Sequence, residues 1–236
     1  HLRGIYLVDI ACVLVMGALL LRRRLPDPPG REPEASTDWG RWLPPLVPVL
    51  LIALLATSLP ALMQSALPLD LVRGGLERAA VPESLGALLI GLQLGLLVLI
   101  QWPVGQALAR RPVRVGLGLS LVCFSLGTLL LAGSALSSRG LLLVLLAQLP
   151  LALGEAAFLP IATEAVIELT PEAHRGLAMA LFSQCFALSA FGAPLLAGFA
   201  LDSQGHGAGL WLGVAVLCLA GLPLVKRLRP RPAVDG

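Results

Sequence analysis

The 236-residue chain is 57% hydrophobic and only 13% charged, and its mean hydropathy is +0.86. This composition excludes a water-soluble globular protein, in which charged residues are about a quarter of the sequence. The formal net charge of +3 comes from basic residues that lie at the ends of apolar runs. Such residues set the orientation of membrane helices, so we assign no nucleic-acid partner.

Seven long apolar runs alternate with polar loops along the chain. Each run is long enough to cross a hydrocarbon core of about 30 Å at about 1.5 Å per residue. We therefore predict an all-α, polytopic membrane protein with seven transmembrane helices that lies in the lipid bilayer. The predicted spans are residues 4–21, 43–69, 84–108, 115–136, 141–168, 176–201 and 208–225.

The basic residues fall mainly on alternate sides of these spans. Thirteen of the 17 Lys and Arg residues lie on one side, at Arg22, Arg23, Arg24, Arg31, Arg41, Arg110, Arg111, Arg114, Arg175, Lys226, Arg227, Arg229 and Arg231. The other side holds Arg3, Arg73, Arg78 and Arg139. The positive-inside rule makes the first side cytoplasmic. We therefore expect a multi-pass protein of the cell (inner) membrane with a cytoplasmic C-terminus.

The stretch 22–41 differs from the rest of the chain, because it combines four prolines with charges of both signs. Such a segment cannot bury enough apolar surface to fold alone and is typical of a flexible linker. We predict a helix within 1–24, a cytoplasmic linker over 25–41, a six-helix bundle over 42–225 and a cytoplasmic tail over 226–236. The opposite loop, 70–83, is expected to hold one short helix.

Four charged residues lie inside the predicted spans, namely Asp9, Glu155, Glu164 and Glu168. An ionised side chain at mid-bilayer costs about 2.5–3.5 kcal/mol on insertion scales, so each needs a partner or a hydrated cavity. Gln148 and Glu155 are seven residues apart and share one helix face, whereas Glu164 and Glu168 share the opposite face. We expect the first pair to face a polar cavity and the second pair to face basic residues at the cytoplasmic edge.

Two interpretations of Glu155 remain open from the residues alone. It binds a proton or substrate, with Gln148, Gln93 and Gln64 as further lining residues, because intramembrane carboxyls are functional by default. Alternatively it is a hydrogen-bonded carboxyl that joins two helices, with Gln93 or Gln184 as its partner.

The sequence offers no signature of an enzyme, a cofactor or a metal site. His1, His174 and His206 lie outside the predicted spans, and neither H-E-x-x-H nor G-x-S-x-G occurs. The four cysteines lie in four different spans without paired spacing. The only lysine, Lys226, lies beyond the last span, which excludes a retinal Schiff base within a helix. A receptor also lacks any positive signature.

Three motifs resemble one family of carriers. The segment Glu168-Leu-Thr-Pro171-Glu-Ala-His-Arg175-Gly176 resembles the E-x-x-P-x-x-x-R-G signature between helices 10 and 11 of the major facilitator superfamily. The segment from Gly105 to Arg114 is similar to the degenerate loop between helices 8 and 9, with Ala109 in place of the acid and Pro112 in place of a glycine. Gly192, Pro194 and Gly198 match a helix-packing pattern of helix 11, and Gly91-x-x-x-Gly95 is a further packing candidate.

This resemblance covers the whole chain and implies helix 6, a central linker and helices 7–12 of a twelve-helix carrier. The first helix would then be the last of the N-terminal bundle, and the rest of that bundle, expected as a partner, would lie outside this sequence. The implied function is secondary active transport of a small solute by alternating access, with protons as the first choice of coupling ion and efflux as the expected direction. The alternative is a non-transporting scaffold that retains the carrier fold.

The resemblance also implies a cytoplasmic gate that stabilises the outward-open state. Arginines of the helix 8–9 loop would pair with the carboxylate at the end of helix 10. Its expected members are Gly105, Arg110, Arg111, Arg114, Glu164, Glu168, Pro171, Arg175 and Gly176.

Overall fold

The computed structural model describes residues 14–15, 18–19 and 39–228, and its chain divides into two compact units, 1–37 and 38–236. In the first unit the four described residues are helical, and their side chains are exposed. Most of the predicted span 4–21, including Asp9, and most of the predicted linker lie outside the described residues. The account below concerns the second unit.

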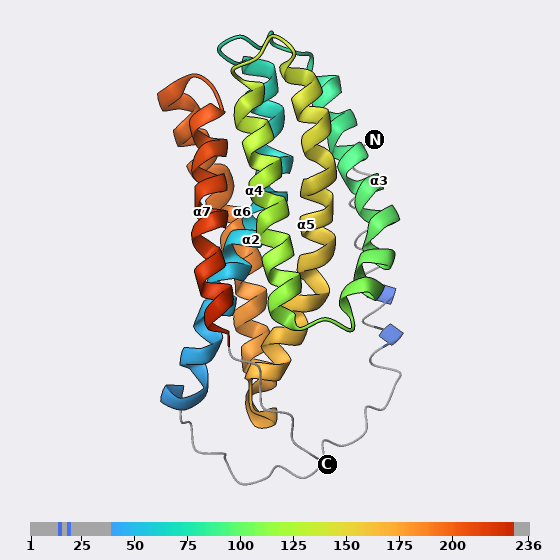
Figure 1. Cartoon of the computed structure of the whole chain (residues 1–236), viewed down its shortest axis with the longest axis vertical. Coiled ribbons are helices and arrows are strands. Elements are labelled where there is room, and N and C mark those ends of the chain that lie inside the picture. The colour runs from blue at the N-terminus through green and yellow to red at the C-terminus, as the bar shows by residue number, and fades with distance from the viewer. Residues whose placement is uncertain (1–13, 16–17, 20–38, 229–236) are drawn as a thin grey trace. The chain divides into compact units, whose positions relative to one another are not determined.

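Six long helices form the described bundle, and successive helices run in opposite directions (Figure 1). They agree closely with the six predicted spans of this region and are long and apolar enough to cross a membrane. The all-α, polytopic fold is thereby confirmed for the described region, and the seventh span stays a prediction. The elements are α2 (Trp39–Arg73), α3 (Glu83–Leu108), α4 (Val113–Ser134), α5 (Gly140–Leu169), the 3-10 helix η1 (Glu172–His174), α6 (Arg175–Gln204) and α7 (Ala208–Arg227).

The alternating directions place the loops at two ends of the bundle. We call one the Asp70 end, which holds loops 74–82, 135–139 and 205–207, and the other the Arg110 end, which holds loops 109–112 and 170–174. Arg73, Arg78 and Arg139 lie at the Asp70 end. The other basic residues of the described bundle lie at or near the Arg110 end, as the sequence predicts.

Glycines allow α4 and α5 to approach closely. A Cβ atom at Gly154 would lie 2.7 Å from the Phe124 ring, and one at Gly127 would lie 2.5 Å from Leu151. The Ser120 hydroxyl donates a 2.8 Å hydrogen bond to the Gly154 carbonyl across this interface. Without water to drive association, such close packing and interhelical hydrogen bonds hold helices together in lipid. The other main contacts join α5 to α3, α7 to α4 and α6 to α2.

One buried ion pair connects four parts of the Asp70 end. Asp70 and Arg78 are 0% and 4% exposed, and an Oδ2 of Asp70 lies 3.1 Å from an Nη2 of Arg78. The Asp70 carboxylate also accepts from the backbone N–H of Gly207 at 2.8 Å and from Trp211 Nε1 at 3.0 Å. Arg78 donates to the Asp70 carbonyl and to the Ser134 hydroxyl. The network therefore ties the ends of α2 and α4 to the start of α7.

The expected short helix in 70–83 is wrong. Helix α2 continues through Asp70 to Arg73, and residues 74–82 form a non-helical loop. This loop is held in place by Arg78 and not by helical hydrogen bonds. The Arg78 guanidinium donates to the Asp70 carbonyl on α2 and to the Ser134 hydroxyl on α4. Gly74 adopts φ +83°, a left-handed conformation that glycine tolerates, and so turns the chain directly after α2.

The buried pair gives the first test. Replacing Asp70 by alanine leaves Arg78 charged and buried, so we expect the free energy of unfolding in detergent micelles to fall by about 3–5 kcal/mol. Asp202→Ala is the matched control, because it removes the exposed pair between Asp202 and Arg73. An exposed pair contributes at most about 1 kcal/mol. If the free energy of unfolding fell equally in Asp70→Ala and Asp202→Ala, the buried network would contribute no more to stability than the exposed pair.

The close approach of α4 and α5 gives the second test. In Gly154→Leu the added side chain collides with Phe124, and overpacking of this kind costs about 1–3 kcal/mol. Gly118 lies on α4, the other helix of this pair, and in Gly118→Leu the added Cβ meets nothing within 4 Å, so stability should not fall. Thermal unfolding of both variants in the same detergent measures the difference. If the midpoint temperature of unfolding fell as far in Gly118→Leu as in Gly154→Leu, close packing at Gly154 would not be the cause of the loss.

Candidate functional site

Three of the predicted polar residues come together between three helices. Gln64 of α2, Gln93 of α3 and Glu155 of α5 line one small cavity, together with Pro60 and Leu94 among other residues. Its volume is about 20 Å³. A cavity needs at least about 10–15 Å³ to hold a water molecule, and a water needs several polar partners. The cavity therefore suits about one water and is too small for an organic solute.

Gln148, the fourth predicted residue, lies behind this cavity and does not line it. It is 0% exposed, and its Nε2 donates to the Val144 carbonyl at 3.0 Å. In the amide orientation that satisfies both polar atoms of Gln93, Gln93 Nε2 donates to Gln148 Oε1 at 3.1 Å, and Gln93 Oε1 accepts from the backbone N–H of Ala152 at 3.1 Å. Gln148 thus joins α3 to α5 and fixes the position of Gln93.

Glu155 differs from the two buried glutamines in its surroundings. It lies midway along α5, is partly buried, and shares the cavity wall with Gln64 and Gln93. A carboxyl group in this position can exchange a proton with a single water in the cavity. The Gln93–Gln148 pair joins α3 to α5. Glu155 also interacts with the Gln93 side chain of α3, so the proton-binding and the helix-joining interpretations of Glu155 both stay predictions.

The expected gate residues gather at the Arg110 end but are not paired as predicted. Arg110, Arg111, Arg114, Glu164 and Glu168 are all exposed. Within the described part of the chain, no ion pair of 4.0 Å or less joins either glutamate to these arginines. The pairing of Glu164 and Glu168 with basic partners therefore stays a prediction.

The loop between α5 and α6 makes a different set of contacts. Arg175 pairs with Glu172 at 3.3 Å, three residues earlier and on the surface. His174 stacks on Trp42, with ring centroids 5.2 Å apart and an interplanar angle of 12°. This stacking attaches the segment that follows Pro171 to the start of α2. Nothing in the sequence predicted it, because the two residues are far apart along the chain.

Four glycines that the sequence analysis selected for packing meet no neighbouring helix within the described bundle, and their packing role stays a prediction. A Cβ atom added at Gly91, Gly95, Gly192 or Gly198 would meet nothing within 4 Å, and the same holds for Gly105 and Gly176. Pro194 lies inside α6 and is partly buried. The helices instead approach at Gly116, Gly127 and Gly154. Spacing identifies pairs of small residues on one face, but the arrangement of the helices decides which face meets a neighbour.

Further polar contacts arise from side chains that the sequence analysis did not select. Thr57 Oγ1 and Ser189 Oγ lie 2.7 Å apart and join α2 to α6. Cys123, Cys185 and Cys218 are buried and free. Among the described residues, no three His, Cys, Asp or Glu side chains are close enough to form a metal site.

The six apolar helices of spanning length in residues 39–228 make the chain a multi-pass membrane protein. Residues 78–236, about two thirds of the chain, match the family model of the Major Facilitator Superfamily. The chain therefore belongs to the Major Facilitator Superfamily, as its motifs indicate. No curated protein sequence matches it. Members of this family are transporters, which places the chain among membrane transporters of small substrates.

Proposed function

We propose that this chain forms part of a secondary active transporter that works by alternating access and couples solute efflux to protons. Helices α2 to α7 would correspond to helices 7–12 of the carrier, and residues 1–24 to helix 6. The Arg110 end and the C-terminus would be cytoplasmic, in the inner membrane. The second bundle would supply the opposite wall of the transport path.

The observation that carries this proposal is the position of Glu155. It lies at mid-span on α5 and lines a cavity of about 20 Å³ together with Gln64 and Gln93. An ionised carboxyl at this depth is costly, so a proton and a water are the natural means of stabilising it. A space of this size favours proton binding over binding of an organic substrate at this point. The main substrate site would then lie beyond the cavity, toward the second bundle.

The roles of the surrounding residues follow from their contacts. Glu155 would bind the proton, and Gln64 would share its water on the α2 side. Gln93 would stabilise the carboxyl from α3, while Gln148 keeps Gln93 in place through their hydrogen bond. Because helices α2, α3 and α5 all line the cavity, protonation or deprotonation of Glu155 would shift these helices relative to one another.

We further propose that the Arg110 end closes through a latch between Glu168 and Arg110, Arg111 or Arg114, with Glu164 and Arg175 as additional members. Apart from Arg175, which is partly buried, these side chains are exposed, and all of them lie at the Arg110 end of the bundle, which supports the proposal. The latch would form in the outward-open state, when the cytoplasmic side is closed.

The proton-binding role predicts that Glu155→Gln abolishes gradient-driven transport, because the amide keeps the shape of the side chain but cannot take up a proton. The measurement is solute-coupled proton movement in vesicles with an imposed pH gradient, followed with an enclosed pH dye. Glu83→Gln is the matched control, since it removes an exposed carboxylate from the first turn of α3. Wild-type rates in Glu155→Gln would overturn the assignment.

The latch predicts that Glu168→Gln favours the inward-open state. A single cysteine at Leu94, on the cavity wall, should then react faster with a membrane-impermeant maleimide added from the cytoplasmic side. The complete carrier is used, with the native cysteines replaced. Glu83→Gln, which removes an exposed carboxylate at the Asp70 end of the bundle, should leave labelling unchanged. Identical labelling of Glu168→Gln and the parent protein would exclude the latch.

A further inference from the structure

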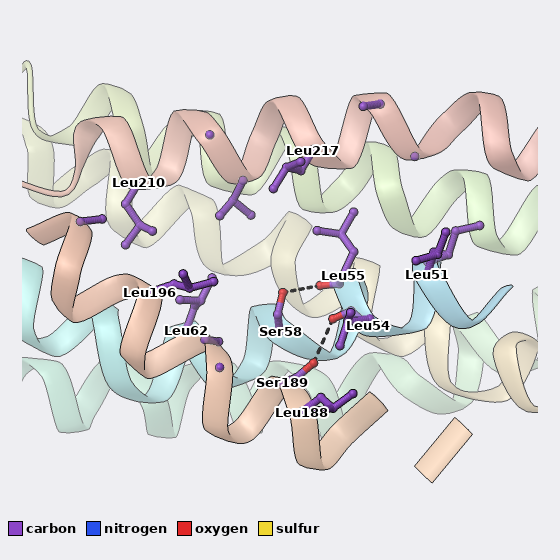
Figure 2. A pocket seen from close by; sticks show the side chains of 18 of the residues that line it. Leu51, Leu54, Leu55, Ser58, Leu62, Leu188, Ser189, Leu196, Leu210 and Leu217 are labelled. Carbon is purple, nitrogen blue, oxygen red and sulfur yellow. Dashed lines mark hydrogen bonds between the residues drawn. The ribbon is translucent and has the colours of Figure 1, made fainter. Parts of the chain in front are cut away.

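Helix α2 borders two spaces that differ in their chemistry. An apolar groove lies between α2, α6 and α7, and leucine side chains from all three helices surround it (Figure 2). The hydroxyls of Ser58 and Ser189 in this groove donate to backbone carbonyls of α2 at 2.6 Å and 2.9 Å. None of the described residues that line the groove is titratable. An exchangeable proton therefore belongs to the polar cavity that Gln64, Gln93 and Glu155 line.

Two buried glutamines form a chain of hydrogen bonds behind the polar cavity. Gln148 of α5 is 0% exposed, and Gln93 of α3 is 6% exposed. Gln148 Nε2 donates to the Val144 carbonyl at 3.0 Å, and a carbonyl oxygen can only accept. The amide of Gln148 therefore keeps its nitrogen on Val144 and presents its Oε1, an acceptor, to Gln93.

The neighbouring groups of α5 fix the orientation of the Gln93 amide. With its nitrogen toward Gln148, Gln93 Nε2 donates to Gln148 Oε1 at 3.1 Å and to the Gln148 carbonyl at 3.0 Å. Gln93 Oε1 then accepts from the backbone N–H of Ala152 at 3.1 Å. The reversed amide would place its oxygen against two acceptors and its nitrogen against a donor. The first orientation therefore gains hydrogen bonds that the reversed one loses.

This orientation decides what Gln93 can offer to Glu155. The two side chains interact at the wall of the cavity. A glutamine amide has two N–H hydrogens, and Gln148 accepts both of them. A lone pair of Gln93 Oε1 remains, and it can only accept. A protonated carboxyl donates to such an oxygen, whereas a carboxylate is repelled by it.

The surroundings of Glu155 offer little else to stabilise a carboxylate. The remaining residues that line the cavity from α2 and α3 are not titratable, namely Pro60, Met63, Gln64, Leu67, Ile90, Gln93 and Leu94. Along α5 the next carboxyl, Glu164, is nine residues later and on the opposite face. The cavity, of about 20 Å³, has room for about one water. Within the described bundle, the neutral acid is therefore the form that fits.

We propose that Val144, Gln148 and Gln93 form a directed hydrogen-bond relay that holds Glu155 as a neutral carboxylic acid in this arrangement of the helices. Gln148 and Gln93 are positioning residues, because Glu155 itself carries the proton. The relay rests on the proposed proton-binding role and adds a condition for proton release. Gln93 comes from α3 and Glu155 from α5, so separation of these helices removes the acceptor. Water can then take its place and solvate a carboxylate.

The infrared spectrum of the complete carrier in lipid vesicles tests the protonation state, because a protonated carboxyl and a carboxylate absorb in separate bands. We expect a carboxylic-acid band at neutral pH in the parent protein that is missing from Glu155→Gln. Titration of this band gives the ratio of protonated to ionised Glu155 at each pH. Absence of the Glu155 acid band at neutral pH in the parent would overturn the proposal. This measurement does not depend on the folding of any relay variant.

Gln148→Met tests the relay itself. Methionine is unbranched and flexible, so it can fill the space of Gln148, but its sulfur is only a weak acceptor. Gln93 then loses one of its anchors and can turn its Nε2 toward an ionised Glu155. We expect the ratio of protonated to ionised Glu155 at a given pH to fall several-fold. The loss of a polar neighbour alone would act in the opposite direction, because apolar surroundings favour the neutral acid.

Gln101→Met is the matched control. Gln101 is exposed on α3 and lies outside the polar cavity, so its replacement should leave the ratio of protonated to ionised Glu155 at the parent value. An unchanged or higher ratio in Gln148→Met would overturn the relay.

Transport measurements distinguish failure of the relay from failure of the proposed function. If Glu155→Gln transports at the wild-type rate while Gln148→Met lowers the ratio of protonated to ionised Glu155, the transport role fails and the relay stands. If Glu155→Gln abolishes transport but Gln148→Met leaves the ratio unchanged, the relay alone fails.

Discussion

Hydrocarbon cannot hydrogen-bond, and the structure depends on this constraint throughout. Every polar group at membrane depth needs a partner within the protein, so the backbone of each span is helical. The same requirement explains why Asp70 and Arg78, which are almost fully buried, share partners from four parts of the chain. It also explains the pairing of Gln93 with Gln148 and of Thr57 with Ser189. Each of these contacts crosses between helices, so the polar groups determine which helices are neighbours.

The bundle has a closely packed part and a more open part. Helices α4 and α5 approach at glycines and share a hydrogen bond, and α7 packs on α4. Helix α6 rests mainly on α2, and the apolar groove separates it from much of α7. The polar cavity lies between these parts, because α5 supplies Glu155 and α2 supplies Gln64. An ionisable group at such a boundary is well placed to respond to movement of one part against the other.

The sequence was sufficient to predict the elements because the signal is local. The predicted span 84–108 agrees with Glu83–Leu108, since length and hydropathy alone decide whether a segment crosses a bilayer. The shared face of Gln148 and Glu155 follows from the helical repeat, although only Glu155 reaches the cavity. That distinction depends on where α3 lies, which no local pattern contains.

Other features depend on contacts between distant residues and could not be predicted. Asp70 looked like a loop residue near the membrane surface, yet its partners Gly207 and Trp211 lie 137 and 141 positions later. Likewise Gly91 and Gly95 have the spacing of a packing motif, but no described helix lies on that face. Charge pairing between Glu168 and the α3–α4 loop was inferred from a motif, and among the described residues no ion pair joins them.

Five prolines lie within α2, and Pro60 lies at a special place among them. It has no N–H group, so the helix offers no donor to the carbonyl of Ala56 four residues earlier. Bending α2 here costs less than bending it at a residue other than proline, because no backbone hydrogen bond has to be broken. Ser58 and Leu62 line the apolar groove on one side of this point, while Pro60 and Gln64 line the polar cavity on the other. Helix α2 therefore forms a flexible wall between the apolar groove and the polar cavity. A bend of α2 at Pro60 would change the widths of both spaces together.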